Sequence, residues 1–518
     1  MTAPRLFSVL LLAGTAWLFA ENVHRYYFLG DDAFISFRYA KHLVQGMGLV
    51  WNPGERVEGY TNFLWVLLMA LSIRLGLDPE SVSNGIGIAS GLGVIAALVV
   101  FSARITSWRN PFVWVAPLTL AASRSFTAWC TGGLETMFFT LLVFLAYLSF
   151  LRERSTRAPR PLGSSLLLAL ATLTRPEGGL FMLVAGLFYA GEILLKRRSF
   201  RSALIWGSPY LAIVGAHLLW RHAYYGCWLP NTFYAKVPGA WWDHGAKYLS
   251  LFAHDYQLLW FLPLLLPVLL LRRQFMTGLF CAATAAYLVY VAYIGGDRFE
   301  FRFLVVVFPY FYGLLADSLY QITQLGGRRL RFATSALAIA VAAALVAATH
   351  VGSRRPEAVG LRHGINSVQA IAQYANWRIE EGVFLRRLID EGILRSDLVL
   401  CVTGAGAVPY YTDWPTVDSL GLNDAEIARL PLEDRGVIGH EREAPYEYLV
   451  ERKVVIFDVL NRVVHRTDRK RREQQHVIHD GRKLPLKVVR VRGRYLIFAT
   501  LLTDEELERT LSPLEILH

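Results

Sequence analysis

The stretch NFLWVLLMALSIRLGL (residues 62–77) decides how often the chain crosses a membrane, and therefore which segments share a side. It is strongly apolar but shorter than the ~20 residues that a transmembrane helix prefers. Apolar runs of membrane length occur elsewhere, and the charges between them can be used to place this stretch. We expect eleven runs to span the membrane: 5–20, 82–103, 111–128, 134–151, 162–174, 179–195, 202–220, 257–271, 275–294, 303–320 and 332–350.

The basic loops between these runs indicate that residues 62–77 do not cross. If the stretch stays on one side, every basic loop lies on the same side as Arg5, as the positive-inside rule requires. If it crosses, all of these loops lie outside. We therefore expect an interfacial helix at 62–77 and a cytoplasmic N-terminus. The loops in question are Arg104/Arg109, Arg152/Arg154/Arg157/Arg160, Lys196/Arg197/Arg198/Arg201, Arg272/Arg273 and Arg328/Arg329/Arg331.

The composition indicates a polytopic α-helical membrane protein. Of the 518 residues, 54% are hydrophobic and only 18% are charged, which exceeds the apolar share of a typical soluble domain. The net charge of +12 comes largely from the basic loops, so we expect a lipid bilayer and no nucleic acid as a partner. The four cysteines have no metal-ligand spacing, and a Cys227–Cys401 disulfide is left open. We interpret residues 6–20 as an uncleaved first span.

The C-terminal residues 351–518 differ in character from the transmembrane domain, residues 1–350. Residues 369–392 show helical periodicity, whereas LVLCVTG, KVVIFDVL and the pair KVVRVRG/RYLIFATL are typical of strands. We expect one small extracytoplasmic α/β domain, for which glycan binding is a candidate role. The basic run at 461–476 predicts a solvated helix face, or else a contact with anionic lipid or an acidic glycan.

The distribution of ionisable residues favours an enzyme over a transporter. Coupled transporters need such groups near the middle of the membrane, but here they gather in the external loops, which include residues 21–81 and several short turns. An active site at the membrane surface suits a lipid-carried substrate. Transfer of a group from a lipid phosphate needs cations to hold the departing phosphate and a carboxylate to take a proton from the incoming hydroxyl.

Several motifs in these loops resemble a known superfamily. An external acidic pair, Asp31 and Asp32, opens the segment DDAFISFRYAKHLVQGMGLVWNPGERVEGYTNFLW (31–65). It is followed by GGLET (132–136), LTRPEG (173–178), GGDRFEFRFLVVVFPY (295–310) and GAVPYYTDWPTVDSLGLND (406–424). Together they resemble the GT-C superfamily of polyprenyl-phosphate-dependent glycosyltransferases. The first-loop segment is similar to that of the terminal β-(1→2)-arabinofuranosyltransferases of actinobacterial cell-wall assembly.

The resemblance implies a polytopic GT-C fold in a bacterial inner membrane, with the active site and C-terminal domain on the periplasmic or extracytoplasmic face. It implies a donor such as decaprenyl-phosphoryl arabinofuranose and an acceptor hydroxyl on an external glycan or glycoconjugate. The catalytic role carries over to Asp31 or Asp32, with Asp31 favoured. Two alternatives stay open: transfer of another lipid-linked sugar, such as mannose or 4-amino-arabinose, to glycan, lipid A or protein, and transport of a lipid-linked glycan.

The remaining candidates are polar residues of the external loops, each with a structural alternative. Arg298, Arg302 and Lys236 are candidates for the donor phosphate, with snorkelling to lipid headgroups as the alternative for the arginines. A divalent cation (Mg²⁺, Mn²⁺ or Ca²⁺) is a candidate cofactor, for which Asp31 and Glu135 are the only ligands with any support. The substrate-orienting candidates, which helix dipoles, ion pairs or turn formation could also explain, are Glu135, Arg175, Glu177, Asp297, Glu58, Tyr60 and Asn62.

Overall fold

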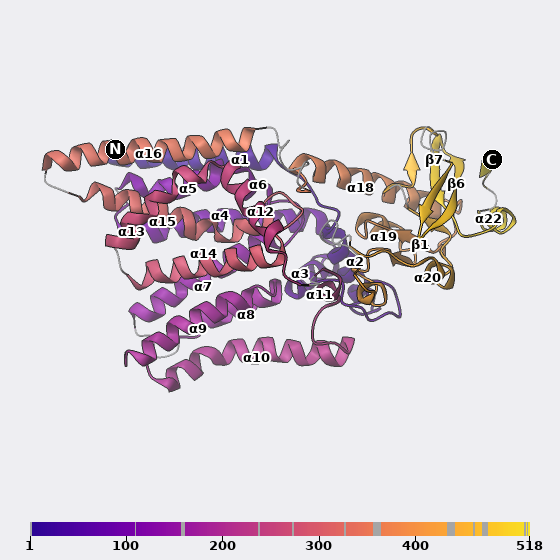
Figure 1. Ribbon diagram of the computed structural model, residues 1–518, viewed down its shortest axis with the longest axis horizontal. Helices are drawn as coiled ribbons and strands as arrows, with labels where there is room; N and C mark the ends of the chain where they lie inside the picture. The colour runs from indigo at the N-terminus through magenta and orange to yellow at the C-terminus, as the bar shows by residue number, and fades with distance from the viewer. Residues whose placement is uncertain are drawn as a thin grey trace.

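The structure, a computed structural model, consists of a helical bundle at one end and a mixed β-sheet region at the other (Figure 1). Short helices of the first loop, α2 (Ala33–Val44) and α3 (Phe63–Arg74), lie between the two together with α11 (Asn231–Lys236). It describes residues 3–108, 110–156, 161–236, 239–271, 274–325, 328–355, 364–432, 441–458, 461–468, 475–511, 514 and 516–517.

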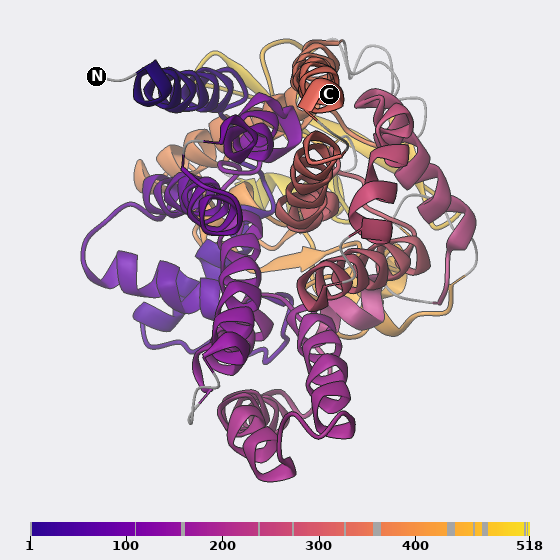
Figure 2. The same cartoon turned by 90° about the vertical axis from the view of Figure 1, so that its left-hand side faces the viewer.

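Seven helices among the described residues are long and apolar enough to cross a membrane. They run side by side in Figure 1, and Figure 2 shows the bundle from its end. The helix that begins at Arg302 is the most enclosed of them, because 72% of its apolar 18-residue segment is buried. The seven are α1 (Ala3–Arg25), α4 (Pro79–Ile105), α7 (Thr136–Ser155), α10 (Phe200–Tyr225), α14 (Phe275–Ile294), η4 with α15 (Arg302–Val307, Phe308–Thr323) and α16 (Arg328–Arg354).

Four of the eleven predicted spans differ from single full-length helices. Residues 162–174 and 179–195 form the shorter helices α8 (Gly163–Thr174) and α9 (Gly178–Leu194). Residues 111–128 break into η1 (Pro111–Trp114), α5 (Val115–Ala122) and α6 (Arg124–Ala128), because Ser123 is extended and caps α6. The predicted span at 257–271 is likewise divided, into η2 (Leu258–Trp260), η3 (Leu262–Leu264) and α13 (Leu265–Leu271), and it meets α12 (Trp242–Asp255) at 77°.

A buried arginine accompanies the break at Ser123, inside the predicted span 111–128. Arg124 donates its Nε–H to Glu300 Oε1 at 2.9 Å, and the Ser125 hydroxyl donates to the same oxygen at 2.8 Å. Both ionised side chains are almost fully enclosed. The broken segment therefore belongs to the protein interior, where irregular backbone can find partners.

Contacts between helix ends agree with the predicted arrangement of the loops. The last turns of α7 and α9 and the basic segment after α9 touch one another, since Arg198 donates to Glu153 O at 2.7 Å and Arg154 pairs with Glu192 at 3.2 Å. The opposite ends of the same helices carry the GGLET and TRPEG turns. The 12-residue helix α3, about 18 Å long at 1.5 Å per residue, is shorter than a full span, and its interfacial position stays a prediction.

The C-terminal region is a mixed eight-stranded sheet with helices on its flanks. The strands are ordered β2-β1-β3-β7-β6-β5, β4 pairs with β7 and β8 pairs with β6. β1 is parallel to β2 and β3, and the other pairings are antiparallel. The elements are α18 (Val368–Asp390), β1 (Leu400–Val402), α19 (Ala407–Thr412), β2 (Thr416–Asp418), η5 (Ile427–Arg429), α20 (Tyr446–Glu451), β3 (Ile456–Phe457), β4 (Val464–His465), β5 (His476–His479), β6 (Arg482–Val491), β7 (Arg494–Ala499), α22 (Asp504–Leu511) and β8 (Ile516–Leu517).

Residues 461–468 do not form the predicted helix, and the four cysteines are unpaired. Residues 461–468 of the basic run contain the short strand β4 where a helix face was predicted, because Val464 and His465 pair with β7; residues 469–474 lie outside the described part. The four cysteines, all within it, form no disulfide, and Cys401 is buried in β1.

The first loop fastens the C-terminal region to the bundle through buried polar contacts. Arg38 of α2 donates its Nε–H to Trp51 O at 2.7 Å and an Nη2–H to Trp414 O at 2.9 Å. Asn52 exchanges two hydrogen bonds with the backbone of Thr416, at 2.8 and 3.1 Å. Because Trp414 and Thr416 lie in or beside β2, these contacts join the sheet region to the first loop at the end of the bundle.

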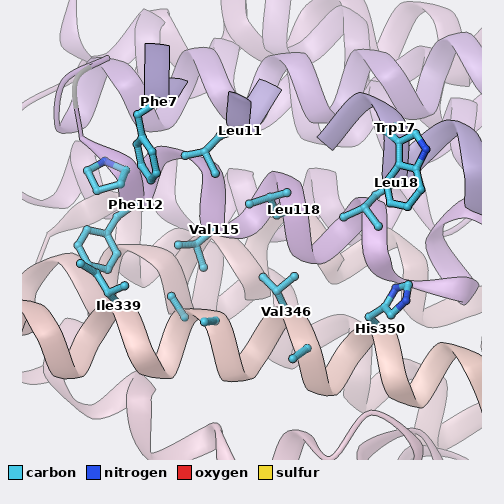
Figure 3. A pocket seen from close by; sticks show the side chains of 14 residues that line it. Phe7, Leu11, Trp17, Leu18, Phe112, Val115, Leu118, Ile339, Val346 and His350 are labelled. Atoms are coloured by element: carbon cyan, nitrogen blue, oxygen red, sulfur yellow. The ribbon is translucent and has the colours of Figure 1, made fainter. Parts of the chain in front are cut away.

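A cavity of about 480 Å³ is an apolar groove between helices of the bundle rather than a candidate for polar chemistry. Figure 3 shows Phe7 and Leu11 of α1 facing Val115 of α5 and Ile339 of α16. Its lining is almost entirely hydrocarbon, which is typical of surface that meets lipid tails. Asp31 and Asp32 are not among its residues.

Candidate active site

A double-glycine turn sets the position of the acid pair at the start of α2. Gly132 and Gly133 have φ angles of +83° and +73°, which glycine adopts without strain. Gly30 donates its N–H to Gly132 O at 3.0 Å, and Gly132 donates its own N–H to Phe28 O at 2.8 Å. The glycines of GGLET thus let the turn before α7 pack directly against the residues that precede the acids.

Asp31 links the first loop to the C-terminal region. Its side chain is buried, and Oδ1 accepts the backbone N–H of Ala407, the first residue of α19, at 2.8 Å. Oδ2 lies beside Gly404, where a Cβ would be 3.4 Å from it. Burial raises the pKa of the Asp31 carboxyl, an effect that the charge of Arg378 opposes. One oxygen of Asp31 is therefore held while the carboxyl is kept more basic than usual.

Asp32 faces a cation instead of capping its own helix. It occupies the N-cap position of α2, yet its side chain makes no capping hydrogen bond. Its Oδ1 lies 3.5 Å from Nη2 of Arg298, and each of the two side chains is about one-quarter exposed (25% and 26%). The two acids therefore have different partners: Asp31 contacts α19, and Asp32 contacts an arginine.

The three predicted phosphate-binding residues lie near Asp32, but only two of them face open space. Lys236 and Arg298 line the same cavity as the acid pair. The pKa of Lys236 is lowered because protein surrounds the amine, an effect that Asp32 opposes. Arg302 does not line the cavity, and it donates its Nε–H to Asp297 Oδ2 at 2.8 Å. The cavity therefore offers an amine and a guanidinium to an anionic ligand.

The cavity itself lies between the end of the bundle and the C-terminal region and has a volume of about 270 Å³. Its bundle side carries Asp31, Asp32, Lys236 and Arg298. The C-terminal region contributes Tyr374, Thr403, Asp418 and Asn461, together with Asn366, whose backbone N–H donates to Arg298 O at 2.6 Å. Two carboxylates and two cations thus meet a set of neutral polar groups and one further carboxylate.

Four predicted orienting residues contact one another and are absent from the cavity lining. Asn62 donates to Glu135 Oε2 at 2.8 Å and to the hydroxyl of Ser36 in α2 at 3.0 Å. Arg175 donates to Glu135 Oε1 at 3.1 Å and to Glu177 Oε1 at 2.7 Å. This buried network joins α2, α3, α7 and the α8–α9 turn, so it braces the floor beneath the acid pair, and a role in orienting substrate stays a prediction.

Glu58 and Tyr60 pack against the end of α10. Glu58 Oε2 lies 2.7 Å from Arg221 Nε, and the Tyr60 hydroxyl lies 3.1 Å from that of Tyr225. Burial raises the pKa of Glu58 to about 7 despite the nearby arginine. Neither residue lines the cavity, so any contact with a sugar would require a rearrangement of the first loop.

The sequence predicted glycan binding as a candidate role for the C-terminal domain but singled out no residue on its side of the cavity. Thr403 follows β1 and Asp418 ends β2, and the carboxyl ends of parallel strands meet at one edge of a sheet. Burial raises the pKa of Asp418 to about 6. Polar residues directly after the predicted strand LVLCV were the available signal. Tyr374, in the middle of α18, carried none, because its helical context is shared with many surface tyrosines.

Comparisons with known proteins agree with this architecture. A family described as a domain of unknown function (DUF8728) matches residues 369–500. Two terminal beta-(1->2)-arabinofuranosyltransferases are similar over part of the chain. That of Mycobacterium tuberculosis is 28% identical over 278 residues, 50% of this chain and 43% of the relative. That of Corynebacterium glutamicum is 27% identical over 337 residues, 57% and 48% of the two chains. The chain spans about half the length of these curated relatives.

Two solved structures of ArnT from Cupriavidus metallidurans decide the fold. The apo structure matches 96% of this chain and 98% of its own with a TM-score of 0.55 at 14% identity. The chain has the ArnT fold. The structure bound to undecaprenyl phosphate matches 79% of this chain and 85% of its own, with a TM-score of 0.52 at 13% identity. The similarity to the two arabinofuranosyltransferases bears out the predicted resemblance, and the ArnT fold confirms the predicted polytopic fold class.

The candidate cation ligands do not form a metal site within this ArnT fold. The described residues contain no group of three or more His, Cys, Asp or Glu side chains placed to hold a metal ion. Both oxygens of Glu135 already accept hydrogen bonds from Asn62 and Arg175, and Asp31 Oδ1 accepts one from Ala407. An arginine at 3.1 Å from Glu135 also repels a cation. The donor set of Asp31 and Glu135 thus does not fit Mg²⁺, Mn²⁺ or Ca²⁺.

We expect Gly406→Ala to disturb the junction between Asp31 and α19. A Cβ at this position would lie 2.0 Å from the Asp31 carbonyl oxygen and 2.6 Å from Asp31 Cγ, so one backbone must move. Overpacking of this kind costs about 1–3 kcal/mol. Hydrogen exchange should accelerate in residues 31–34 and 403–410. Gly207→Ala in α10, where a Cβ meets nothing within 4 Å, is the matched control; equal exchange in both variants would contradict the contact.

Proposed function

We propose that this protein is a membrane glycosyltransferase that moves a sugar from a polyprenyl-phosphate donor to a hydroxyl of an external glycan or glycoconjugate. The observation that carries the proposal is the cavity in which Asp31 and Asp32 face Lys236 and Arg298 at the end of the bundle. The ArnT fold and the similarity to two arabinofuranosyltransferases support it. D-arabinofuranose is the sugar that we propose, because both curated relatives carry that activity in their names.

The donor would bind with its phosphate between Lys236 and Arg298. A guanidinium grips phosphate oxygens through a fixed fork of N–H groups, and a lysine adds a compact charge. Asp32 lies 3.5 Å from Arg298 and keeps that guanidinium oriented in the absence of phosphate. As the bond to the sugar breaks, negative charge develops on the leaving phosphate, and the two cations stabilise it.

Asp31 is the group that we propose to act on the sugar or on the acceptor. In the overall transfer, the acceptor oxygen forms a bond to the anomeric carbon, the bond from that carbon to the phosphate oxygen breaks, and the phosphate leaves with the electron pair. The acceptor proton passes to a carboxylate. A carboxylate here can take that proton directly or bond first to the anomeric carbon, and both routes need Asp31 ionised. Its raised pKa makes it a stronger base.

We further propose that the protein lies in a bacterial inner membrane with the C-terminal region and the cavity on the extracytoplasmic face. The clustering of basic residues in the loops at the opposite end of the bundle supports this orientation, since such loops stay in the cytoplasm. A reporter fused to the chain after residue 511 should then be active only outside the cytoplasm. A cytoplasmic reporter would reverse the orientation and contradict an external acceptor.

The test is a transfer assay with purified protein in lipid nanodiscs. Labelled decaprenyl-phosphoryl arabinofuranose and a synthetic arabinoside acceptor should yield an extended product detectable by mass spectrometry. Lys236→Met and Arg298→Gln should each raise the donor KM about 10- to 100-fold, because hydrogen bonds to charged groups contribute about 1.5–3 kcal/mol. Arg387→Met, on the exposed side of α18, serves as the control for loss of a surface charge.

The same assay separates the alternatives. Transfer only from a mannose or 4-amino-arabinose donor would keep the enzyme class and replace the sugar. Movement of a labelled lipid-linked glycan across the bilayer, without transfer, would favour a transporter. Failure of the wild-type protein to transfer any of the three sugars would count against the glycosyltransferase proposal as a whole.

A further inference from the structure

We propose that the C-terminal region supplies the subsite that binds the acceptor sugar, with Tyr374 and Asp418 as its specificity-determining residues. This inference rests on the proposed function, which it deepens by dividing the cavity into a donor half and an acceptor half. The division follows from where each polar group comes from in the fold and from the charge that it carries.

The proposed subsite lies at the carboxyl ends of the parallel strands β1 and β2. β1 lies between β2 and β3, and the chain leaves β1 on one side to form β2 and later returns on its other side to form β3. Ligands of open α/β sheets bind outside the carboxyl ends of the strands at such a switch point. Thr403, Gly404 and Asp418 occupy those ends, and all three line the cavity.

The charges of the cavity are unevenly distributed between its two sides. Both cations of the cavity come from the bundle side, through Lys236 and Arg298, whereas the C-terminal side offers neutral amides and hydroxyls with the carboxylate of Asp418. An anionic phosphate is attracted to the first set and repelled by the acid in the second. Hydroxyl groups suit the second set, since they can donate to a carboxylate and accept from an amide.

Asp418 and Tyr374 on the C-terminal side have hydrogen-bonding capacity that the residues described in the structure do not use. Asp418 accepts hydrogen bonds from Leu420 N at 3.2 Å, from Asn423 N at 2.9 Å and from Asn423 Nδ2 at 3.0 Å. A carboxylate has about four acceptor positions, so one is left for a ligand. The Tyr374 hydroxyl has no hydrogen-bond partner within the described part of the chain, and burial raises its pKa, so it stays protonated and can donate.

The direction of approach assigns this half to the acceptor. A polyprenyl donor enters from the bilayer and brings its phosphate to the bundle side, where the cations lie. The C-terminal region lies beyond the end of the bundle (Figure 1), so an external glycan that arrives from water would meet it first. The cavity of about 270 Å³ is smaller than the ~300–1,000 Å³ pockets that enclose drug-sized ligands. It therefore suits a terminal sugar, with the rest of the glycan outside.

Binding of the acceptor without any donor tests the subsite apart from the reaction. Saturation-transfer NMR with nanodisc-embedded protein would measure the Kd of a synthetic arabinoside. Tyr374→Phe removes one hydroxyl and should weaken binding about 3- to 10-fold, and Asp418→Asn should weaken it about 10-fold or more. Tyr495→Phe on β7, which does not line the cavity, is the matched control and should bind like wild type.

Steady-state kinetics provide the second readout. Tyr374→Phe and Asp418→Asn should raise the acceptor KM and leave the donor KM unchanged, whereas Lys236→Met should do the reverse. If wild type binds the arabinoside and both C-terminal variants bind it equally well, the subsite is wrong; absence of binding by wild type also overturns it. If wild type transfers no sugar but binds the arabinoside through Tyr374, the proposed function fails and the subsite stands.

Discussion

Asp31→Asn should lower kcat at least 10³-fold, whereas Asp32→Asn should act about 10-fold and mainly through the donor KM. Loss of a general acid–base group typically costs 10²- to 10⁴-fold. Asn keeps an oxygen that can accept the Ala407 N–H, now 2.8 Å from Asp31 Oδ1, so the junction with α19 survives the change. Asp32 contacts Arg298 at 3.5 Å, so its loss releases a phosphate-binding group without removing it.

The pH dependence of transfer provides a separate check on Asp31. Burial raises its pKa above the ordinary value of 3.8, so the ionised fraction falls at a higher pH than for an exposed aspartate. The activity of wild type should be full above the raised pKa and should decline as the pH decreases through it. Asp32→Asn removes a neighbouring negative charge that adds to the shift, and its acid limb should therefore move to lower pH. An Asp31→Asn variant with wild-type kcat would assign the reaction to another group.

Much of the fold could be predicted because its signals are local. Apolar runs of about 20 residues identified the long helices, and the basic loops predicted that α3 stays on one side. The helix α18 and strands β1, β3, β6 and β7 followed from short-range periodicity. The breaks at Ser123 and in residues 257–271 were missed, since a buried ion pair such as Arg124–Glu300 stabilises irregular backbone only after distant helices meet.

The candidate site was predictable only on its bundle side. Asp31, Asp32, Lys236 and Arg298 stand out in the sequence because charged residues beside apolar spans need a reason. Tyr374 and Asp418 belong to a region whose strands and helix look ordinary, and they reach the cavity only because the first loop holds that region over the bundle. The Asn62–Glu135–Arg175 network was likewise invisible, as its members are far apart in sequence and are joined by tertiary contacts.

We expect a large loss of stability when Arg378, which is fully buried in the C-terminal region, is replaced. It donates to Asp458 Oδ2 at 2.5 Å and to Glu381 Oε2 at 3.3 Å, and a further N–H reaches Gly404 O at 3.2 Å. The guanidinium thus neutralises two acids and holds the loop that carries Ala407 to Asp31. Removing one partner of a buried ionic cluster leaves uncompensated charge and typically destabilises a protein by about 3–5 kcal/mol.

Arg378→Met should therefore unfold the C-terminal region at a temperature roughly 10 °C lower, given about 2–4 °C per kcal/mol for domains of 150–250 residues. Burial already raises the pKa of Glu381 to about 7 in spite of the arginine. Its folded-state pKa lies above the ordinary value of 4.5, so this acid favours the folded state most at low pH and loses that contribution as the pH rises through 7.

The pH dependence of the stability of Arg378→Met distinguishes loss of the charged partner from loss of packing. Without the guanidinium, Glu381 resists ionisation more strongly, so Arg378→Met should recover part of its lost stability at pH 5 and lose most at pH 8. Arg387→Met, on the same helix with a side chain that is 75% exposed, should change the free energy of unfolding by less than about 1 kcal/mol at either pH. A destabilisation of Arg378→Met that is independent of pH would point to lost packing, and an unchanged unfolding temperature would refute the buried cluster as the support of the 403–407 loop.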